Sequence, residues 1–221
     1  MRFGLPNGIN WFLEFSAFVL FINLLVAPLG TGVLAAFNVI LNLNSVAFMP
    51  AFGLSSAGAI LVGQTIGRRL HDEVWPIVKR TARVTLAWQG GVGAVYVLMP
   101  GPLMSLFATG ESATSDLVRV GSTMLAISSV WQVFDALGLT LGEALRAAGD
   151  TAWCLWARLV IAWTVFLPVS WFTITRLHAG PKGAMWCVVF YIVVLAAALA
   201  WRFRSGAWRR IDLTGHGMPE A

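Results

Sequence analysis

Charged residues are scarce in this sequence. Only 11% of the 221 residues are Asp, Glu, Lys or Arg, whereas 58% are hydrophobic and the mean hydropathy is +0.77. Soluble domains carry about a quarter charged residues, so this scarcity excludes an ordinary water-soluble domain. The eleven Trp residues agree, because indole rings gather at membrane–water interfaces. The composition therefore predicts an integral membrane protein.

Residues that carry covalent or metal chemistry are also few. The two cysteines, Cys154 and Cys187, lie in apolar runs without metal-ligand spacing, so we expect small core residues there. The three histidines fall in loops or the tail, and the sequence has no evident phosphate loop or nucleophile–base pair. We therefore expect no enzyme activity and no cofactor. The net charge of +5 could suggest a nucleic-acid partner, but the basic residues cluster at the ends of apolar runs. Membrane topology explains this placement, so we expect no nucleic-acid partner.

Six apolar stretches are long enough to cross a lipid bilayer, which takes about 20 residues in a helix. They predict an all-α bundle of six transmembrane helices over residues 1–201, followed by a basic cytoplasmic tail over residues 202–221. The predicted spans are roughly 6–28, 33–65, 82–100, 117–145, 153–175 and 183–201.

The basic residues are unevenly divided between the two ends of these spans. If Arg158 is counted with the connection before the fifth span, only Arg119, Arg176 and Lys182 lie on the side away from the termini. The other twelve of the fifteen Lys and Arg residues lie on the side of the termini. Cytoplasmic loops carry the excess of positive charge, so both termini are predicted to be cytoplasmic, in an inner or plasma membrane.

Two local patterns predict details of the packing. Gly63 and Gly67 form a GxxxG pair in the second span, which predicts a close approach of another helix. Between the fourth and fifth spans, Gly149 is expected to end one helix, and Asp150 or Thr151 to cap the next. That connection predicts a tight hairpin.

Two acids lie within apolar runs, Glu14 in the first span and Asp135 in the fourth. A charged carboxylate at the bilayer centre costs at least ~2.5–3.5 kcal/mol, so each must be protonated, paired or exposed to a polar cavity. At 1.5 Å per residue, they lie about 12 and 16 Å from the cytoplasmic ends of their spans and can share one layer. Polar residues that could line the same pocket are Asn10, Asn23, Asn42, Asn44 and Gln132.

One interpretation of this layer is a site that binds Na⁺ or H⁺ through Glu14 and Asp135 and couples the ion to movement. The alternative is two unrelated acids, each satisfied by its neighbours within the bundle. Spacing alone leaves both open.

Four groups of residues, spread over nearly the whole chain, form a recognisable pattern. They are Gly4–Pro6 with Glu14, Ser45–Gly53 through Val62–Gln64, Trp131–Gln132 with Asp135, and Leu145–Thr151. Together, and in this order, they resemble the multidrug and toxic compound extrusion (MATE) transporters, specifically their C-terminal six-helix lobe.

The resemblance implies that this chain forms one of two six-helix lobes, which together flank a central cleft. Drug or metabolite, typically a small organic cation, would leave through the cleft by alternating access in exchange for Na⁺ or H⁺. The resemblance matches Glu14 and Asp135 to the family's cation-coupling acids. The second six-helix lobe would be a missing N-terminal half, a second copy in a homodimer, or another chain.

Other functions remain open at this point. The chain could be a non-transporting remnant or a structural membrane bundle, or a related flippase of lipid-linked oligosaccharides. The flippases tend to carry basic residues in the central cavity, and we expect none at mid-depth in these six spans.

Overall fold

The computed structural model describes residues 4–108 and 111–211, and within them the side chains of all but 4–11, 14, 111–116 and 210. These described residues form helices and connecting turns without any strand. The α-helices are α1 (Gly4–Phe21), α2 (Thr31–Gly67), α3 (Val74–Leu98), α4 (Pro100–Ser105), α5 (Glu111–Ala147), α6 (Thr151–Val160), α7 (Leu167–Trp171) and α8 (Gly180–Arg204).

Several α-helices are prolonged by π or 3-10 turns, so that the chain forms long rods. The segments Ile22–Val26 and Ala27–Leu29 extend α1 to the turn before α2. Ile161–Phe166 joins α6 to α7, and Phe172–Arg176 extends α7. Two short 3-10 turns flank the rods elsewhere, at His71–Glu73 before α3 and at Ala207–Arg210 after α8.

The predicted fold class, an all-α membrane helix bundle, is confirmed. Among the described residues, four helical stretches are long and apolar enough to cross a membrane: Thr31–Gly67, Leu117–Ala147, Thr151–Arg176 and Gly180–Arg204. A shorter apolar stretch, Phe15–Leu29, completes the first rod. The helix α3 is less apolar because Lys79, Arg80 and Arg83 occupy its first half.

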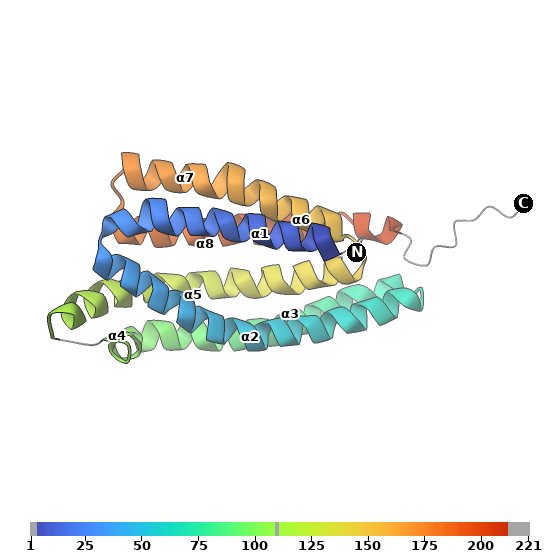
Figure 1. Ribbon diagram of the computed structural model, residues 1–221. Helices are drawn as coiled ribbons and strands as arrows, with labels where there is room; N and C mark the ends of the chain where they lie inside the picture. The colour runs from blue at the N-terminus through green and yellow to red at the C-terminus, as the bar shows by residue number, and fades with distance from the viewer. Residues whose placement is uncertain (1–3, 109–110, 212–221) are drawn as a thin grey trace, which may run out of the picture.

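The rods run back and forth along one axis (Figure 1). The start of α1, the α2–α3 and α5–α6 connections and the end of α8 lie at one end of the bundle. The α1–α2 turn, α4 and the α7–α8 connection lie at the other. We call the first of these the basic end, because Arg68, Lys79, Arg146 and Arg204 lie in or beside its connections.

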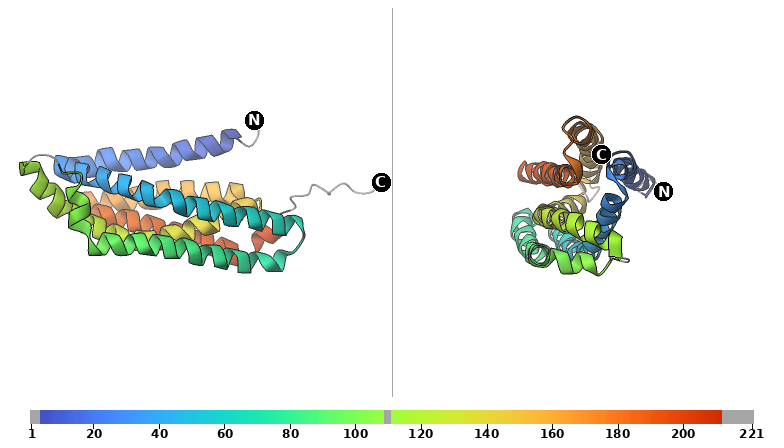
Figure 2. Two further views of the ribbon diagram at one scale, coloured as in Figure 1. Left: turned by 90° about the horizontal axis from the view of Figure 1, so that it is seen from below. Right: turned by 90° about the vertical axis from the view of Figure 1, so that its left-hand side faces the viewer.

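The helix α5 lies at the centre of the bundle. It packs against α2, α3 and α8, while α1 lies against α6 and α7 (Figure 2). Large side chains in this interior are fully buried, among them Phe21, Phe37, Leu125 and Leu145. The helix α5 therefore lies between two groups of helices, α2, α3 and α8 in one and α1, α6 and α7 in the other, and it contacts α6 as well. Its side chains line the space between the two groups.

The α5–α6 connection is the predicted tight hairpin, with one difference. Gly149 has a φ of +84°, a left-handed conformation that glycine adopts without strain, and α6 begins two residues later. Asp150, however, makes no capping hydrogen bond to the backbone. Its carboxylate instead accepts hydrogen bonds from Arg202 Nε and Nη2, at 2.6 and 3.2 Å, and so ties the hairpin to the end of α8.

No helix of the described residues approaches Gly63 and Gly67 closely, although the pair permits such a contact. A Cβ atom at either position would meet no atom of the described residues within 4 Å. The close approach is at Gly58, where an added Cβ would clash with the side chain of Thr81 on α3. Gly58 is five residues from Gly63, or about 140° around the helix, so the two glycines face different directions. The spacing identifies small residues but not which of them face a neighbour.

Candidate functional site

Asp135 lies in the second half of α5, on a part of the helix that faces α3. Its Oδ2 atom accepts a hydrogen bond of 3.2 Å from Nε2 of Gln89. Gln89 is buried, and its Oε1 atom has no hydrogen-bond partner among the described residues. The amide thus orients one oxygen of the carboxylate. Sequence reasoning missed Gln89, although a lone Gln in the apolar half of α3 was a signal that could have found it.

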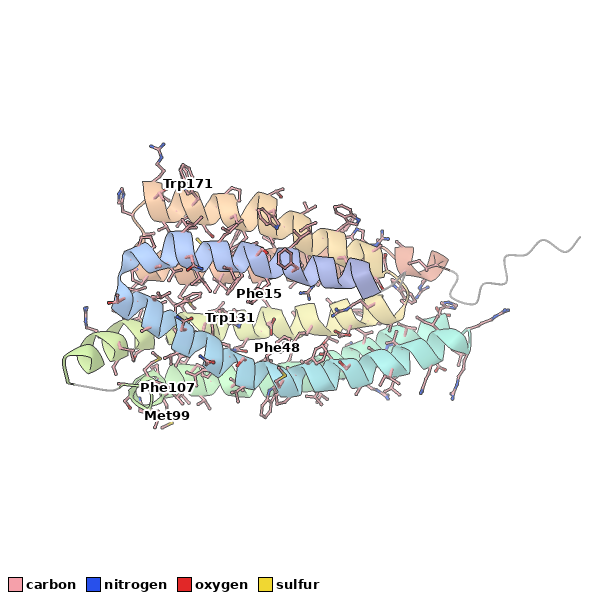
Figure 3. The ribbon with its side chains drawn as sticks, viewed as in Figure 1. Phe15, Phe48, Met99, Phe107, Trp131 and Trp171 are labelled. Atoms are coloured by element: carbon pink, nitrogen blue, oxygen red, sulfur yellow. The ribbon has the colours of Figure 1, made fainter. Side chains whose placement is uncertain are left out.

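Asp135 also lines a cavity of 390 Å³ between α1, α2, α5, α6 and α8. We call this the central cavity. Most of its wall is apolar, and the aromatic members come from four different rods: Phe15, Phe18, Phe48, Phe52, Phe166 and Tyr191. Figure 3 labels two of these rings, Phe15 on α1 and Phe48 on α2. The carboxylate therefore borders a largely apolar cavity with several aromatic rings in its wall.

Two basic side chains share the central cavity with Asp135. Arg158 on α6 and Arg146 near the end of α5 both line it, and Asp135 and Arg158 attract each other electrostatically. Arg146 also forms an ion pair with Glu143 one turn earlier. Arg158 lies inside the predicted fifth span but short of its mid-depth, where we expected no basic residue. It lies seven residues inside α6, about 10 Å along the helix, rather than in the connection.

The other polar residues predicted for the site divide into two groups. Gln132 donates a hydrogen bond from Nε2 to Oδ1 of Asn44, and both side chains are buried between α5 and α2. Asn23 and Asn42 are exposed, and each donates to a carbonyl of its own helix, those of Val19 and Asn38. None of these four residues lines the central cavity. These residues were predicted to share a layer with Asp135 at a similar depth in the membrane, but they lie on other faces of their helices.

Glu14 and Asn10 lie on α1, but their side chains are outside the described residues. The backbone of α1 places Glu14 immediately before Phe15, whose ring lines the central cavity. The paired arrangement of Glu14 and Asp135 therefore stays a prediction. Among the described side chains, no three His, Cys, Asp or Glu residues gather as a metal-binding group.

The fold and this cavity define a helical bundle of the membrane with an acid and two guanidinium groups inside it. The MatE family model matches residues 6–172, most of the chain, and the chain belongs to that family. The resemblance to MATE transporters is thereby confirmed, and the protein is an integral membrane protein of a transporter family.

Curated relatives support the same assignment. The chain is 28% identical over 210 residues to a probable multidrug resistance protein NorM of Thermotoga maritima, covering 95% of this chain and 44% of that protein. It is 28% identical over 206 residues to the multidrug resistance protein NorM of Burkholderia vietnamiensis, covering 90% and 43%. It is 32% identical over 152 residues to a probable NorM of Chromobacterium violaceum, covering 69% and 32%. The chain thus spans less than half the length of these relatives.

Proposed function

We propose that this chain is one lobe of a cation-coupled efflux transporter, in which Asp135 and Glu14 bind the coupling Na⁺ or H⁺. The observation that carries the proposal is the position of Asp135. One of its oxygens is held by Gln89, and the carboxylate borders an aromatic-lined cavity of 390 Å³. A charged acid in such a place is costly, and a bound cation or proton would lower this cost in addition to the attraction of Arg158, so that ion binding can be coupled to movement.

The exported substrate would be a small organic cation. Aromatic rings attract cations through their faces, and the central cavity offers six aromatic side chains around one carboxylate. A substrate cation and a coupling cation would then compete for the same negative charge, which gives exchange without any direct contact between them. The names of the NorM relatives agree with efflux of drugs.

Transport also requires a second six-helix lobe. We propose that the second lobe is supplied by further sequence of the same protein, by a second copy or by another chain, since the NorM relatives are more than twice as long. The six predicted spans cross the membrane with both termini in the cytoplasm, because the basic end carries most of the Lys and Arg. A reporter fused after Ala221 tests the orientation: activity only outside the cell would refute it.

The test of coupling uses this lobe together with its second lobe, reconstituted in vesicles under a Na⁺ or a proton gradient. Asp135→Asn and Glu14→Gln should each reduce gradient-driven export of a fluorescent organic cation to the level of empty vesicles. Glu73→Gln, at an exposed carboxylate before α3, serves as the matched control and should leave export unchanged. Undiminished export by both site variants would exclude the coupling role.

A second candidate function has one observation in its favour. Arg146 and Arg158 place two positive charges in the central cavity, which suits an anionic headgroup and therefore a flippase. Arg158→Gln separates the two functions. It should preserve or increase export of an organic cation, whereas it should abolish flipping of a lipid-linked anionic oligosaccharide. Absence of flux of either substrate in every gradient would leave a non-transporting membrane bundle.

A further inference from the structure

A second apolar hollow lies on the face of α5 that is turned away from the central cavity. This groove, of 430 Å³, runs between α3, α5 and α8. Leu86, Phe134, Leu137 and Val193 are part of its almost wholly apolar wall. In the end-on view of Figure 2, α3 and α8 both lie on the side of the bundle opposite α1. We call this hollow the outer groove.

Basic side chains gather at one end of the outer groove. Lys79 and Arg83, one turn apart near the start of α3, and Arg204 at the end of α8 line it, and all three are exposed. The start of α3 and the end of α8 lie at the basic end of the bundle (Figure 1). The groove is thus apolar along its length and cationic where the bundle meets the membrane surface.

A more polar pocket continues the outer groove at this end. It has a volume of 600 Å³ and shares Trp75, Phe203 and Arg204 with the groove. Its further lining includes Trp208 and Arg209, from the turn that follows α8. No acid lines either hollow among the described residues. Arg209 has an acidic neighbour outside the lining, Asp72, at 3.6 Å.

The pocket is formed by packed rings. Trp208 is only 4% exposed, its Nε1 donates to the carbonyl of Phe203 at 3.1 Å, and the two rings lie 5.5 Å apart. Trp75 packs on the other side, with its ring centroid 5.7 Å from that of Phe203. These contacts hold the turn after α8 against the start of α3, so that Arg204 and Arg209 are presented on a defined surface.

We propose that the outer groove and this pocket bind an anionic diacyl phospholipid from the leaflet at the basic end. An acyl chain would lie along the apolar groove, and the phosphate and headgroup would lie among Lys79, Arg83, Arg204 and Arg209. Basic pockets between transmembrane helices are suited to anionic headgroups, and an acyl chain is the ligand that a membrane supplies to an apolar groove. Trp75 and Trp208 stand at the level where indole rings favour the interface.

Charge complementarity selects this occupant over two others. A second copy bound through the same face would bring its own Lys79, Arg83 and Arg204 against these, since a two-fold interface pairs a patch with itself. An organic cation would meet the same repulsion. The proposal rests on membrane embedding alone and is independent of transport or of the coupling role of Asp135.

The experiment is native mass spectrometry of the purified full chain, titrated with phosphatidylglycerol or with phosphatidylcholine of the same acyl chains. We expect tighter retention of phosphatidylglycerol. Each of Lys79→Gln, Arg83→Gln and Arg204→Gln should weaken its retention by about fivefold, the effect typical of one basic residue near an anionic lipid surface. Arg80→Gln is the matched control, because Arg80 is exposed on the same helix but does not line the groove, and it should have little effect.

A second variant tests the apolar part without changing charge. Ala197→Trp fills the outer groove from an exposed position on α8 and should displace phosphatidylglycerol, whereas Ala94→Trp, at an exposed position of α3 outside the groove, should not. Equal retention of the two lipids, or equal weakening by Arg80→Gln and Arg83→Gln, would overturn the proposal. So would displacement of the lipid by inorganic phosphate alone, or a dimer that Ala197→Trp dissociates.

Discussion

Polar side chains on two faces of α5 have different surroundings. Toward α2, Gln132 is bonded to Asn44, and the hydroxyl oxygens of Ser55 and Thr140 lie 3.4 Å apart, all of them buried. Asp135, one turn from Gln132, accepts a hydrogen bond from Gln89 of α3 and also borders the central cavity. The first side satisfies its polar groups within the protein, while the second leaves charge accessible to a ligand. Of two residues one turn apart, one therefore has its polar group satisfied by the packing of the bundle and the other borders a cavity, where we propose its role in coupling.

The largest expected effect comes from forcing apart α2 and α3, the two helices that pack together beside α5. Gly58→Ala should destabilise the bundle by about 3 kcal/mol, because the added Cβ would lie within 3 Å of three atoms of Thr81 and must push α2 from α3. The measurement is the free energy of unfolding in mixed micelles of mild detergent and dodecyl sulfate. Gly63→Ala, with open space around its Cβ, should change stability by less than about 1 kcal/mol.

Rescue makes this prediction more specific. Thr81→Ala removes the two nearest atoms, Oγ1 and Cγ2, and should restore part of the stability that Gly58→Ala loses. Equal effects of alanine at Gly58 and Gly63 would show that α2 does not pack closely against α3 at Gly58.

The next effect concerns the aromatic cluster beside the central cavity. Phe21 is fully buried, with its ring centroid 4.8 Å from that of Phe166 and 5.9 Å from that of Phe37. Phe21→Ala should cost roughly 2 kcal/mol, less than in a water-soluble core, because lipid solvates the unpacked ring and only packing is lost. Phe12→Ala, on the same helix and 69% exposed, is the control and should be close to neutral in the same unfolding assay.

A smaller effect is expected from the buried amide pair. Asn44→Leu and Gln132→Met each leave a partner unpaired, and their interaction energy in a double-mutant cycle should be about 1 kcal/mol, as for other hydrogen bonds between membrane helices. Asn42→Leu provides the control, since Asn42 is exposed and bonds only to its own helix. It should show no coupling to Gln132. A cycle with zero interaction for Asn44 would remove the contrast between the two sides of α5.

Much of the fold was predictable because hydropathy is local. Apolar length and helix-breaking residues such as Gly149 can be recognised from neighbouring residues alone, and the all-α membrane bundle followed from them. The rotation of each helix about its axis is not local. It decides that Gly58 rather than Gly63 meets α3, and that Asn42 points outward while Asn44 points inward.

The candidate site was likewise predictable only in its local features. Asp135 was identifiable, because a carboxylate in an apolar run is costly whatever surrounds it. Its partners were not, because Gln89 is 46 residues away along the chain, and Arg158, inside the predicted fifth span, was counted only as a charge on the side of the termini. Depth in the membrane can be estimated by counting residues, but the face on which a side chain lies requires the packed structure.

The smallest expected change in stability belongs to Asp135 itself. Asp135→Asn keeps an oxygen that can accept the hydrogen bond from Gln89, and the side chain borders a cavity rather than a packed interface, so the free energy of unfolding should change by about 0.5 kcal/mol or less. The same unfolding assay in micelles measures it. A loss above about 2 kcal/mol, as expected for a buried group left unpaired, would make Asp135 a structural residue like Gln132. Near-neutral stability together with lost gradient-driven export would separate the two sides of α5 by function as well as by packing.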